Sequence, residues 1–400
     1  MSDPRLSPLA TRSLGPPTEA AQSQARAPET RRALKTPRDR RAFTLVELLI
    51  AMLIGLVVVA GLYNLFTTQT KQFLYQDLQM EMHQNGRLAA DVLGRTARVA
   101  GFGTAGSVTG VLGWDGSAGD EEVSLPAIIS YDASGSNGSD AITLVSMDPG
   151  LTMATNAAQP PVCDTSELSF DASFQDNAER LAQLDVGELI MCVDYTTVGT
   201  FNSYLWPIAA VDSSTGQVLV TPAVHDDYIN RCAQMGNLPM VLVCSRAEVA
   251  TFYIDADDTD GIGAGSPAHP VLMMDLDFES PDEDDIPVVD HIEDLQIEYC
   301  VSSGPGNTDC SDSANWRNGL TVTDVNSVYM VRFTLVVRSS RQDPQRLHPG
   351  APLSVANNAP AATPDNYFRQ ALTTEVTVRN LRMQALINPT DTVAEGTIVP

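Results

Sequence analysis

Glu47 is the one charged side chain in an apolar run of 24 residues that extends from Phe43 to Phe66. An ionisable side chain inside hydrocarbon costs about 2.5–3.5 kcal/mol on insertion scales, so one that occurs there normally has a partner. The pattern therefore predicts that Glu47 has a partner.

A second candidate site is an acidic run in which Asp255, Asp257, Asp258 and Asp260 are followed by Gly261. Calcium takes six to eight oxygen ligands from a flexible loop, and four carboxylates in seven residues supply several of them. The run does not follow the spacing of an EF-hand loop, because no Glu stands at the twelfth position. We expect an acidic surface turn and keep calcium binding as the alternative.

All six cysteines follow the apolar run. They are Cys163, Cys192, Cys232, Cys244, Cys300 and Cys310. An even number in an oxidising compartment favours disulfides, for which six cysteines allow 15 pairings. Proximity in sequence favours Cys232–Cys244 and Cys300–Cys310, which leaves Cys163–Cys192. A zinc site is the alternative, but there is no C-x-x-C pair and no histidine at ligand spacing.

Catalysis finds little support in the sequence. The five histidines are scattered and none falls in a known hydrolase or metalloprotease motif; they are His83, His225, His269, His291 and His348. No phosphate-binding glycine loop is present. We therefore expect a protein that is not an enzyme and has no cofactor, with calcium the one possible ion.

The charge distribution separates the first 42 residues from the rest. Residues 1–42 hold nine basic and four acidic side chains, which leaves 15 basic and 46 acidic side chains and a net charge of −31 after Ala42. Phosphate attraction requires a basic patch, so we predict no nucleic-acid partner.

As a helix with a rise of about 1.5 Å per residue, the apolar run spans about 36 Å, more than the roughly 30 Å of a hydrocarbon core. Arg38, Arg40 and Arg41 precede it directly. Because basic flanks stay in the cytoplasm, we expect the residues after the helix to lie outside the inner membrane. A secretory signal peptide has a shorter apolar region and a cleavage site after it, so it does not fit.

The stretch Phe43-Thr44-Leu45-Val46-Glu47-Leu48-Leu49-Ile50-Ala51 after a basic leader resembles the type IV prepilin signature. The resemblance implies that a prepilin peptidase removes residues 1–42 by cutting between Ala42 and Phe43, and that it methylates the new amine of Phe43. It also implies that Glu47 pairs with the N-terminal amine of a neighbouring subunit. Ala42 stands where the family usually has Gly.

Residues 67–103 are predicted to continue the helix as an amphipathic segment to about Ala100. The apolar stripe is formed by Leu74, Leu78, Met82, Ala89, Val92, Leu93, Ala97 and Ala100. Gly101 and Gly103 are suited to end it. The segments His83-Gln84-Asn85-Gly86-Arg87 and Arg98-Val99-Ala100-Gly101-Phe102 resemble PilW-type minor pilins.

Residues 104–400 change to short β-rich runs between Gly, Pro, Asn, Asp and Ser clusters. The predicted strands are Ala127–Tyr131, Ala141–Ser146, Glu188–Val193, Leu205–Val211, Gln217–Thr221, Met240–Cys244, Val249–Asp255, Val271–Asp277, Ile292–Val301, Ser327–Arg338 and Thr373–Arg379. Long loops are expected at Gly106–Glu121, Thr155–Asp185 and Gln342–Asp365. The resemblance implies an α+β fold, in which a long N-terminal helix packs on an antiparallel sheet and the β-rich domain is enlarged.

The leading interpretation is a minor pilin that enters a type IV pilus near its tip and promotes assembly. The implied partners are other pilins and minor pilins, the prepilin peptidase, the inner membrane and the pilus assembly machinery. Before assembly the expected place is the inner membrane, as a single-pass protein with a periplasmic domain, and after assembly the pilus at the cell surface. The alternatives are a J-type pseudopilin of a type II secretion system and a pilin-anchored protein for surface binding or adhesion.

Overall fold

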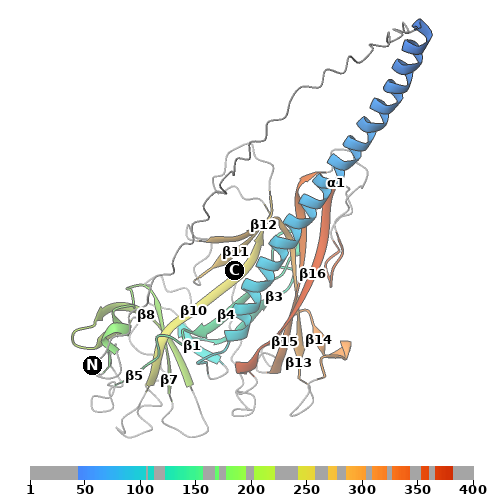
Figure 1. Cartoon of the computed structure of the whole chain (residues 1–400). Coiled ribbons are helices and arrows are strands. Elements are labelled where there is room, and N and C mark those ends of the chain that lie inside the picture. Colours follow the sequence, from blue (N-terminus) through green and yellow to red (C-terminus); the bar gives the residue numbers. More distant parts are fainter. Residues whose placement is uncertain are drawn as a thin grey trace, which may run out of the picture. The chain divides into compact units, whose positions relative to one another are not determined.

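The computed structural model shows one long helix followed by β-rich structure (Figure 1). The residues that it describes are 44–104, 107–111, 122–155, 167–170, 177–194, 202–220, 242–256, 269–276, 285–302, 309–321, 327–342, 353–359 and 365–381. The chain divides into two compact units, Met1–Thr67 and Thr68–Pro400. The division falls within the helix, so its two parts belong to different units.

Helix α1 extends over 55 residues, from Leu45 to Val99. Every residue from Thr44 to Phe66 is exposed. In the second unit the helix buries one face, formed by Leu78, Met82, Gly86, Ala89, Leu93, Gly94 and Ala97. The spacing of three to four residues confirms the predicted amphipathic stripe, although Leu74 is 41% exposed.

The C-terminal end of α1 is closed by a left-handed glycine and by an amide. Gly101 has φ +78°, a conformation that L side chains rarely adopt, and its N–H donates to the carbonyl oxygen of Val145 at 2.9 Å. The Asn380 side chain donates to the carbonyl oxygens of Val99 and Ala100 at 3.1 and 3.3 Å. These bonds occupy two of the carbonyls that a helix end leaves without a partner.

A four-stranded antiparallel sheet, in the order β14-β13-β15-β16, packs against the second half of α1 (Figure 1). Its strands are β13 (Ile292–Val301), β14 (Trp316–Arg317), β15 (Val328–Gln342) and β16 (Tyr367–Thr377). The main core combines side chains of α1 and of this sheet with side chains of the larger sheet, and its fully buried members include Leu93, Leu295 and Phe333. This arrangement confirms the expected α+β fold.

The larger sheet has twelve strands, and its longest path is β12-β11-β10-β7-β8-β1-β2. The strands of that path are β1 (Ser107–Val111), β2 (Glu122–Pro126), β7 (Leu189–Asp194), β8 (Asn202–Asp212), β10 (Leu242–Asp255), β11 (Val271–Asp275) and β12 (Ile286–Asp290). The others are β3 (Ile128–Tyr131), β4 (Ala141–Met147), β5 (Met153–Ala154), β6 (Glu167–Ser169) and β9 (Gln217–Val220). All pairs are antiparallel except β1 with β8.

A second apolar core is formed by residues from the sequence range 151–244. It contains Tyr204 and Trp206, whose rings stack with centroids 5.5 Å apart. Cys192 and Cys244 are buried in the same core. A short helix, α2 (Asn177–Leu181), contributes Leu181 to it. The enlargement of the domain is thus a lobe with its own apolar core.

The bounds of β10 and β16 differ from those of the predicted strands. Met240–Cys244 and Val249–Asp255 were expected as separate strands, but one strand, β10, runs through both and through the polar residues between them. The last strand was expected to begin at Thr373, whereas β16 begins at Tyr367. Within the expected loops, Gly106–Glu121 contains β1, and Thr155–Asp185 contains β6 and α2.

Candidate functional site in the N-terminal helix

Thr44 and Glu47 form a reciprocal pair of hydrogen bonds at the start of α1. The backbone N–H and the hydroxyl of Thr44 both donate to Oε2 of Glu47 at 3.1 Å. The backbone N–H of Glu47 donates to the Thr44 hydroxyl oxygen at 3.3 Å. This is a capping box, in which the residue before the helix and the third helical residue satisfy each other's free amides.

The capping role of Thr44 was not predicted, although the sequence contained the signal for it. A Ser or Thr followed three residues later by Glu, just before an apolar run, is the sequence pattern of a capping box. Within the described residues both side-chain bonds of Glu47 use Oε2, so Oε1 keeps its capacity to accept hydrogen bonds. A carboxylate near a helix N-terminus is also stabilised by the helix dipole.

The segment that carries Glu47 exposes apolar side chains on all of its faces. Leu45, Leu53 and Leu56 are 75%, 68% and 73% exposed. α1 contains a window long and apolar enough to cross a membrane, and none of that window is buried within the chain. Burial of such a segment requires lipid or the helices of other subunits.

The predicted processing residues, Ala42 and Phe43, lie outside the described residues, as does the rest of the leader. Cleavage between them and methylation of Phe43 remain predictions. The described chain starts at Thr44, one residue after the predicted mature N-terminus.

The cysteine pairing was predicted correctly at one of the two disulfides within the described residues. Cys300 is bonded to Cys310, as expected. The expected Cys232–Cys244 pair is wrong, because Cys244 is bonded to Cys192, and this also excludes Cys163–Cys192. Cys192 and Cys244 lie directly opposite each other on β7 and β10, although 52 residues separate them in sequence. Cys163 and Cys232 lie outside the described residues.

Of the acidic run, the structure describes only Asp255 and Ala256. Asp255 ends β10 opposite Val271, and Asp257, Asp258 and Asp260 lie outside the described residues. Calcium binding by this run therefore remains a prediction. Elsewhere, the residues that the structure describes contain no group of three or more His, Cys, Asp or Glu arranged to hold a metal ion.

In the second unit, two buried carboxylates, Asp140 and Asp294, accept hydrogen bonds from loop and strand residues. Asp140 is 2% exposed and accepts hydrogen bonds from the N–H groups of Ala133 and Ile297 at 2.8 and 2.7 Å. Burial raises the pKa of the Asp140 carboxyl to about 6, and the two N–H donors offset part of the shift. Burial likewise raises the pKa of Asp294, which accepts from Gln296 and Asn358.

Two family models match the chain. One describes the prokaryotic N-terminal methylation motif and covers residues 37–63, and the other describes the type IV pilus-assembly protein W, PilW, and covers residues 251–380. The chain is a PilW-type type IV pilin. The first match contains Glu47 and the apolar half of α1, and the second contains the whole of the four-stranded sheet.

A solved structure, the type IV-like pilin TTHA1219 from Thermus thermophilus, aligns with 75% of this pilin and 96% of its own chain. The TM-score is 0.30 and the sequence identity 10%, so the assignment rests on the two family models. No curated protein matches the sequence.

The family assignment makes this pilin a pilus-associated minor pilin, in a family whose members are structural rather than catalytic. It implies interaction with other components of the pilus. The methylation motif and the apolar helix suit membrane anchoring and later packing in a filament. The second lobe, residues 151–244, lies outside both matches.

Proposed function

We propose that this minor pilin is incorporated near the tip of a type IV pilus and helps to start its assembly. The observation that carries the proposal is Glu47, a carboxylate in the first turn of a helix whose apolar residues are all exposed as far as Phe66. Such a helix is stored in the bilayer, because only lipid or other apolar helices can cover it. Assembly then exchanges lipid contacts for contacts with neighbouring helices.

Glu47 gives this exchange a direction. In the single subunit the capping box satisfies Oε2, while Oε1 is available to a donor from another chain. The N-terminal amine of a neighbouring subunit is such a donor, and it reaches Glu47 only when the two helices are in register. A charged amine left without a partner in this environment costs several kcal/mol, so subunits out of register are rejected.

Two further arguments concern the side of the membrane on which the second unit lies and the position of the protein in the filament. Arg38, Arg40 and Arg41 favour a cytoplasmic leader, which puts the second unit on the periplasmic side. The lobe of residues 151–244 enlarges the globular domain. A large domain is accommodated most easily at the tip, where no further subunit packs on one of its sides.

The test compares wild type with Glu47→Ala for the amount of processed protein in the membrane and in sheared pili. Removing the charge favours membrane insertion, so the membrane fraction should be unchanged or larger. Incorporation into pili should fall by orders of magnitude, because several kcal/mol correspond to such a factor. Equal amounts in pili would show that Glu47 has no role in ordered assembly.

Asp91→Ala is the matched control, because Asp91 is a half-exposed acidic residue of the same helix whose one ion pair within the described residues is with Arg95 on the surface. It should enter pili at the wild-type level. The role in initiation is tested by counting pili per cell after deletion of the gene. Fewer pili of normal length support initiation, whereas an unchanged number contradicts it.

A further inference from the structure

The second half of α1 has an outer face that the described residues leave uncovered. At about 100° of rotation per residue, a position five residues from another is turned roughly 140° away from it. Phe73 and Leu88 each precede a buried leucine, Leu78 or Leu93, by five residues. Met80 follows Leu78 by two residues and is turned roughly 160° away from it. These three side chains therefore lie opposite the buried face of the helix.

Exposed apolar side chains are concentrated on this part of the helix. Phe73, Met80 and Leu88 are 70%, 60% and 51% exposed. In a surface helix of a globular domain, the residues opposite the buried stripe are normally polar or charged. After Phe66 the described residues include ten exposed large apolar side chains, and five of them lie on α1 between positions 73 and 88. Apolar side chains gathered in this way mark an interaction surface, whereas single ones are normal.

Two arginines without an acidic partner lie on the same outer face. Arg87 follows Met80 by seven residues, which is about two turns, and Arg98 follows Arg87 by eleven residues, which is about three turns. Both are exposed, and neither forms an ion pair within the described residues. Between them Asp91 pairs with Arg95 at 2.6 Å, so this pair leaves no net charge for a partner.

The charge of this segment contrasts with that of the rest of the chain. Residues 84–98 hold three arginines and one aspartate, a net charge of +2. After Ala42 the chain holds 15 basic and 46 acidic side chains, a net charge of −31. Although acidic side chains are so numerous, those described leave Arg87 and Arg98 without a partner. The two arginines are thus available to carboxylates of another molecule, which complementary charges attract and orient.

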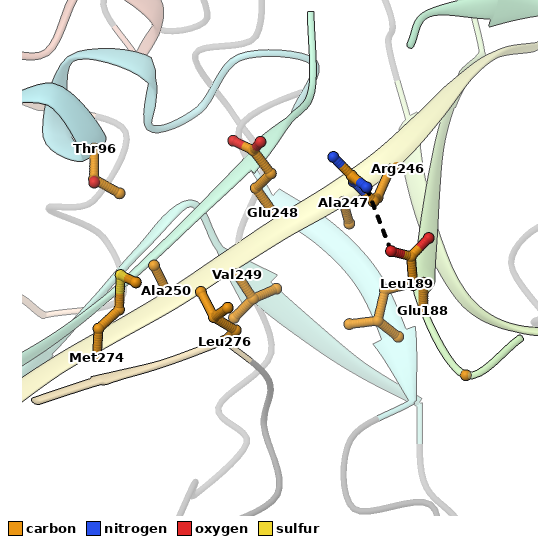
Figure 2. Close-up of a pocket in the computed structure, with 11 residues that line it drawn as sticks. Thr96, Glu188, Leu189, Arg246, Ala247, Glu248, Val249, Ala250, Met274 and Leu276 are labelled. Atoms are coloured by element: carbon orange, nitrogen blue, oxygen red, sulfur yellow. Dashed lines mark hydrogen bonds and ion pairs between the residues drawn. The ribbon is translucent and has the colours of Figure 1, made fainter. Parts of the chain in front are cut away.

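The groove beside β10 offers no comparable surface. It has a volume of about 530 Å³ and is lined in part by residues 247–250 (Figure 2). Its arginine, Arg246, already pairs with Asp148 at 3.1 Å and with Glu188 at 3.4 Å. The charge of this arginine is therefore satisfied within the chain, unlike the charges of Arg87 and Arg98.

We infer that the outer face formed by Phe73, Met80, Arg87, Leu88 and Arg98 docks a different subunit of the filament. That subunit presents apolar side chains to the first part of the face and carboxylates to the two arginines. This inference rests on the proposed function, because the partner belongs to the same pilus. At about 1.5 Å per residue the arginines are about 16 Å apart along the helix axis, so the two carboxylates need a similar separation.

Other occupants fit this face less well. In a symmetric contact between parallel helices of two copies, each arginine would lie near its equivalent and the like charges would repel. A head-to-tail contact between copies would continue into a filament of this protein alone, which does not suit a minor pilin. Hydrocarbon could cover Phe73 and Met80, but it offers no group to Arg87 or Arg98.

Photo-cross-linking in piliated cells tests the partner. A photoreactive residue at Met80 should join this pilin to a different pilus subunit, through a surface that also carries carboxylates. The same group at Leu219, an exposed position on β9, is the control and should not capture that surface. A link from Met80 to a second copy, to another part of the same chain, to lipid or to no subunit would overturn the inference.

A double charge reversal tests the arginines. Arg87→Glu with Arg98→Glu changes no buried side chain and should reduce the Met80 cross-link at least about tenfold, because like charges then face each other across the contact. Arg341→Glu with Arg379→Glu is the matched control, since it changes the charge equally at two exposed arginines outside α1. It should leave the cross-link unchanged. Equal losses in both proteins would mean that only net charge matters, and would contradict the inference.

A compensating change in the partner completes the test. Once the cross-link has located the partner's carboxylates, their replacement by Lys should restore the link to the protein with Arg87→Glu and Arg98→Glu. If the wild-type protein is present in pili, an unchanged cross-link after the double reversal, or a failure of this rescue, contradicts the inference alone. Absence of the wild-type protein from pili contradicts the proposed function instead.

Discussion

Gly61 and Gly86 lie in the same helix but in different surroundings. A Cβ atom added to Gly61 would have nothing within 4 Å, whereas one added to Gly86 would lie 3.1 Å from Leu372 Cδ2 and from Val337 Cγ2. The second half of α1 completes its packing within the chain, so small residues there are needed for close approach of the sheet. The first half has no such contacts and must obtain them from lipid or from other subunits.

The largest contrast is expected from Leu93→Ala and Leu53→Ala, one leucine from each half. Leu93 is fully buried and Leu53 is 68% exposed. Leu93→Ala should lower the free energy of unfolding by about 2–5 kcal/mol, because it leaves a cavity in the core. Leu53→Ala should leave it unchanged. Denaturant unfolding of the full-length protein in detergent, followed by tryptophan fluorescence, measures both. Equal losses would mean that the two halves do not differ as described.

A smaller contrast is expected from Gly86→Val and Gly61→Val. At Gly86 the new side chain would overlap Leu372 and Val337, so it should destabilise the protein by about 1–3 kcal/mol. At Gly61 the same side chain would point into open space, so the free energy of unfolding should stay unchanged. A Gly86→Val protein as stable as wild type would show that β16 moves freely relative to α1.

The smallest effect concerns pH and is confined to the second unit. The raised pKa of Asp140, about 6 against about 3.9 unfolded, means that the folded state binds the proton more tightly. Its contribution to stability is therefore greatest at low pH and decreases as the pH rises from about 4 to about 6. Asp140→Asn should remove this decrease. It should also lower the stability by about 1 kcal/mol at every pH, because one of the two N–H groups loses its acceptor.

His291 has the opposite effect on the pH dependence of stability, so it serves as a comparison for Asp140. Burial lowers the pKa of this imidazole, so the unfolded state binds its proton more tightly. Stability is then lost as the pH falls below about 6.5. His291→Asn retains a residue that tolerates the observed φ of +65° and should reduce that loss. Unfolding free energies measured between pH 4 and pH 7.5 for both variants would separate the two groups; parallel curves contradict the assignment.

Local patterns predicted the helix and most strands, and failed where distant segments meet. The amphipathic stripe was correctly placed because a period of 3.6 residues reflects burial on one face of a helix. The strands Ile292–Val301 and Ala141–Ser146 were also correctly placed, as short apolar runs that are buried along nearly their whole length. β10 was divided in two because the polar residues Ser245 and Arg246 interrupt its apolar pattern. In the structure Ser245 donates to the carbonyl oxygen of Asp148 and Arg246 pairs with Asp148, so both remain within a strand.

The apolar run, the position of Glu47 within it, the acidic character of the chain after Ala42 and the glycine that ends the helix can all be read from the amino-acid sequence alone. These properties depend on residues within a few positions of one another. The Cys192–Cys244 bond, the contact of Gly86 with β16 and the groove along Ala247–Ala250 were decided only by the tertiary structure. Each depends on the register of strands far apart in the chain, and register follows from the packing of the whole sheet rather than from local propensity.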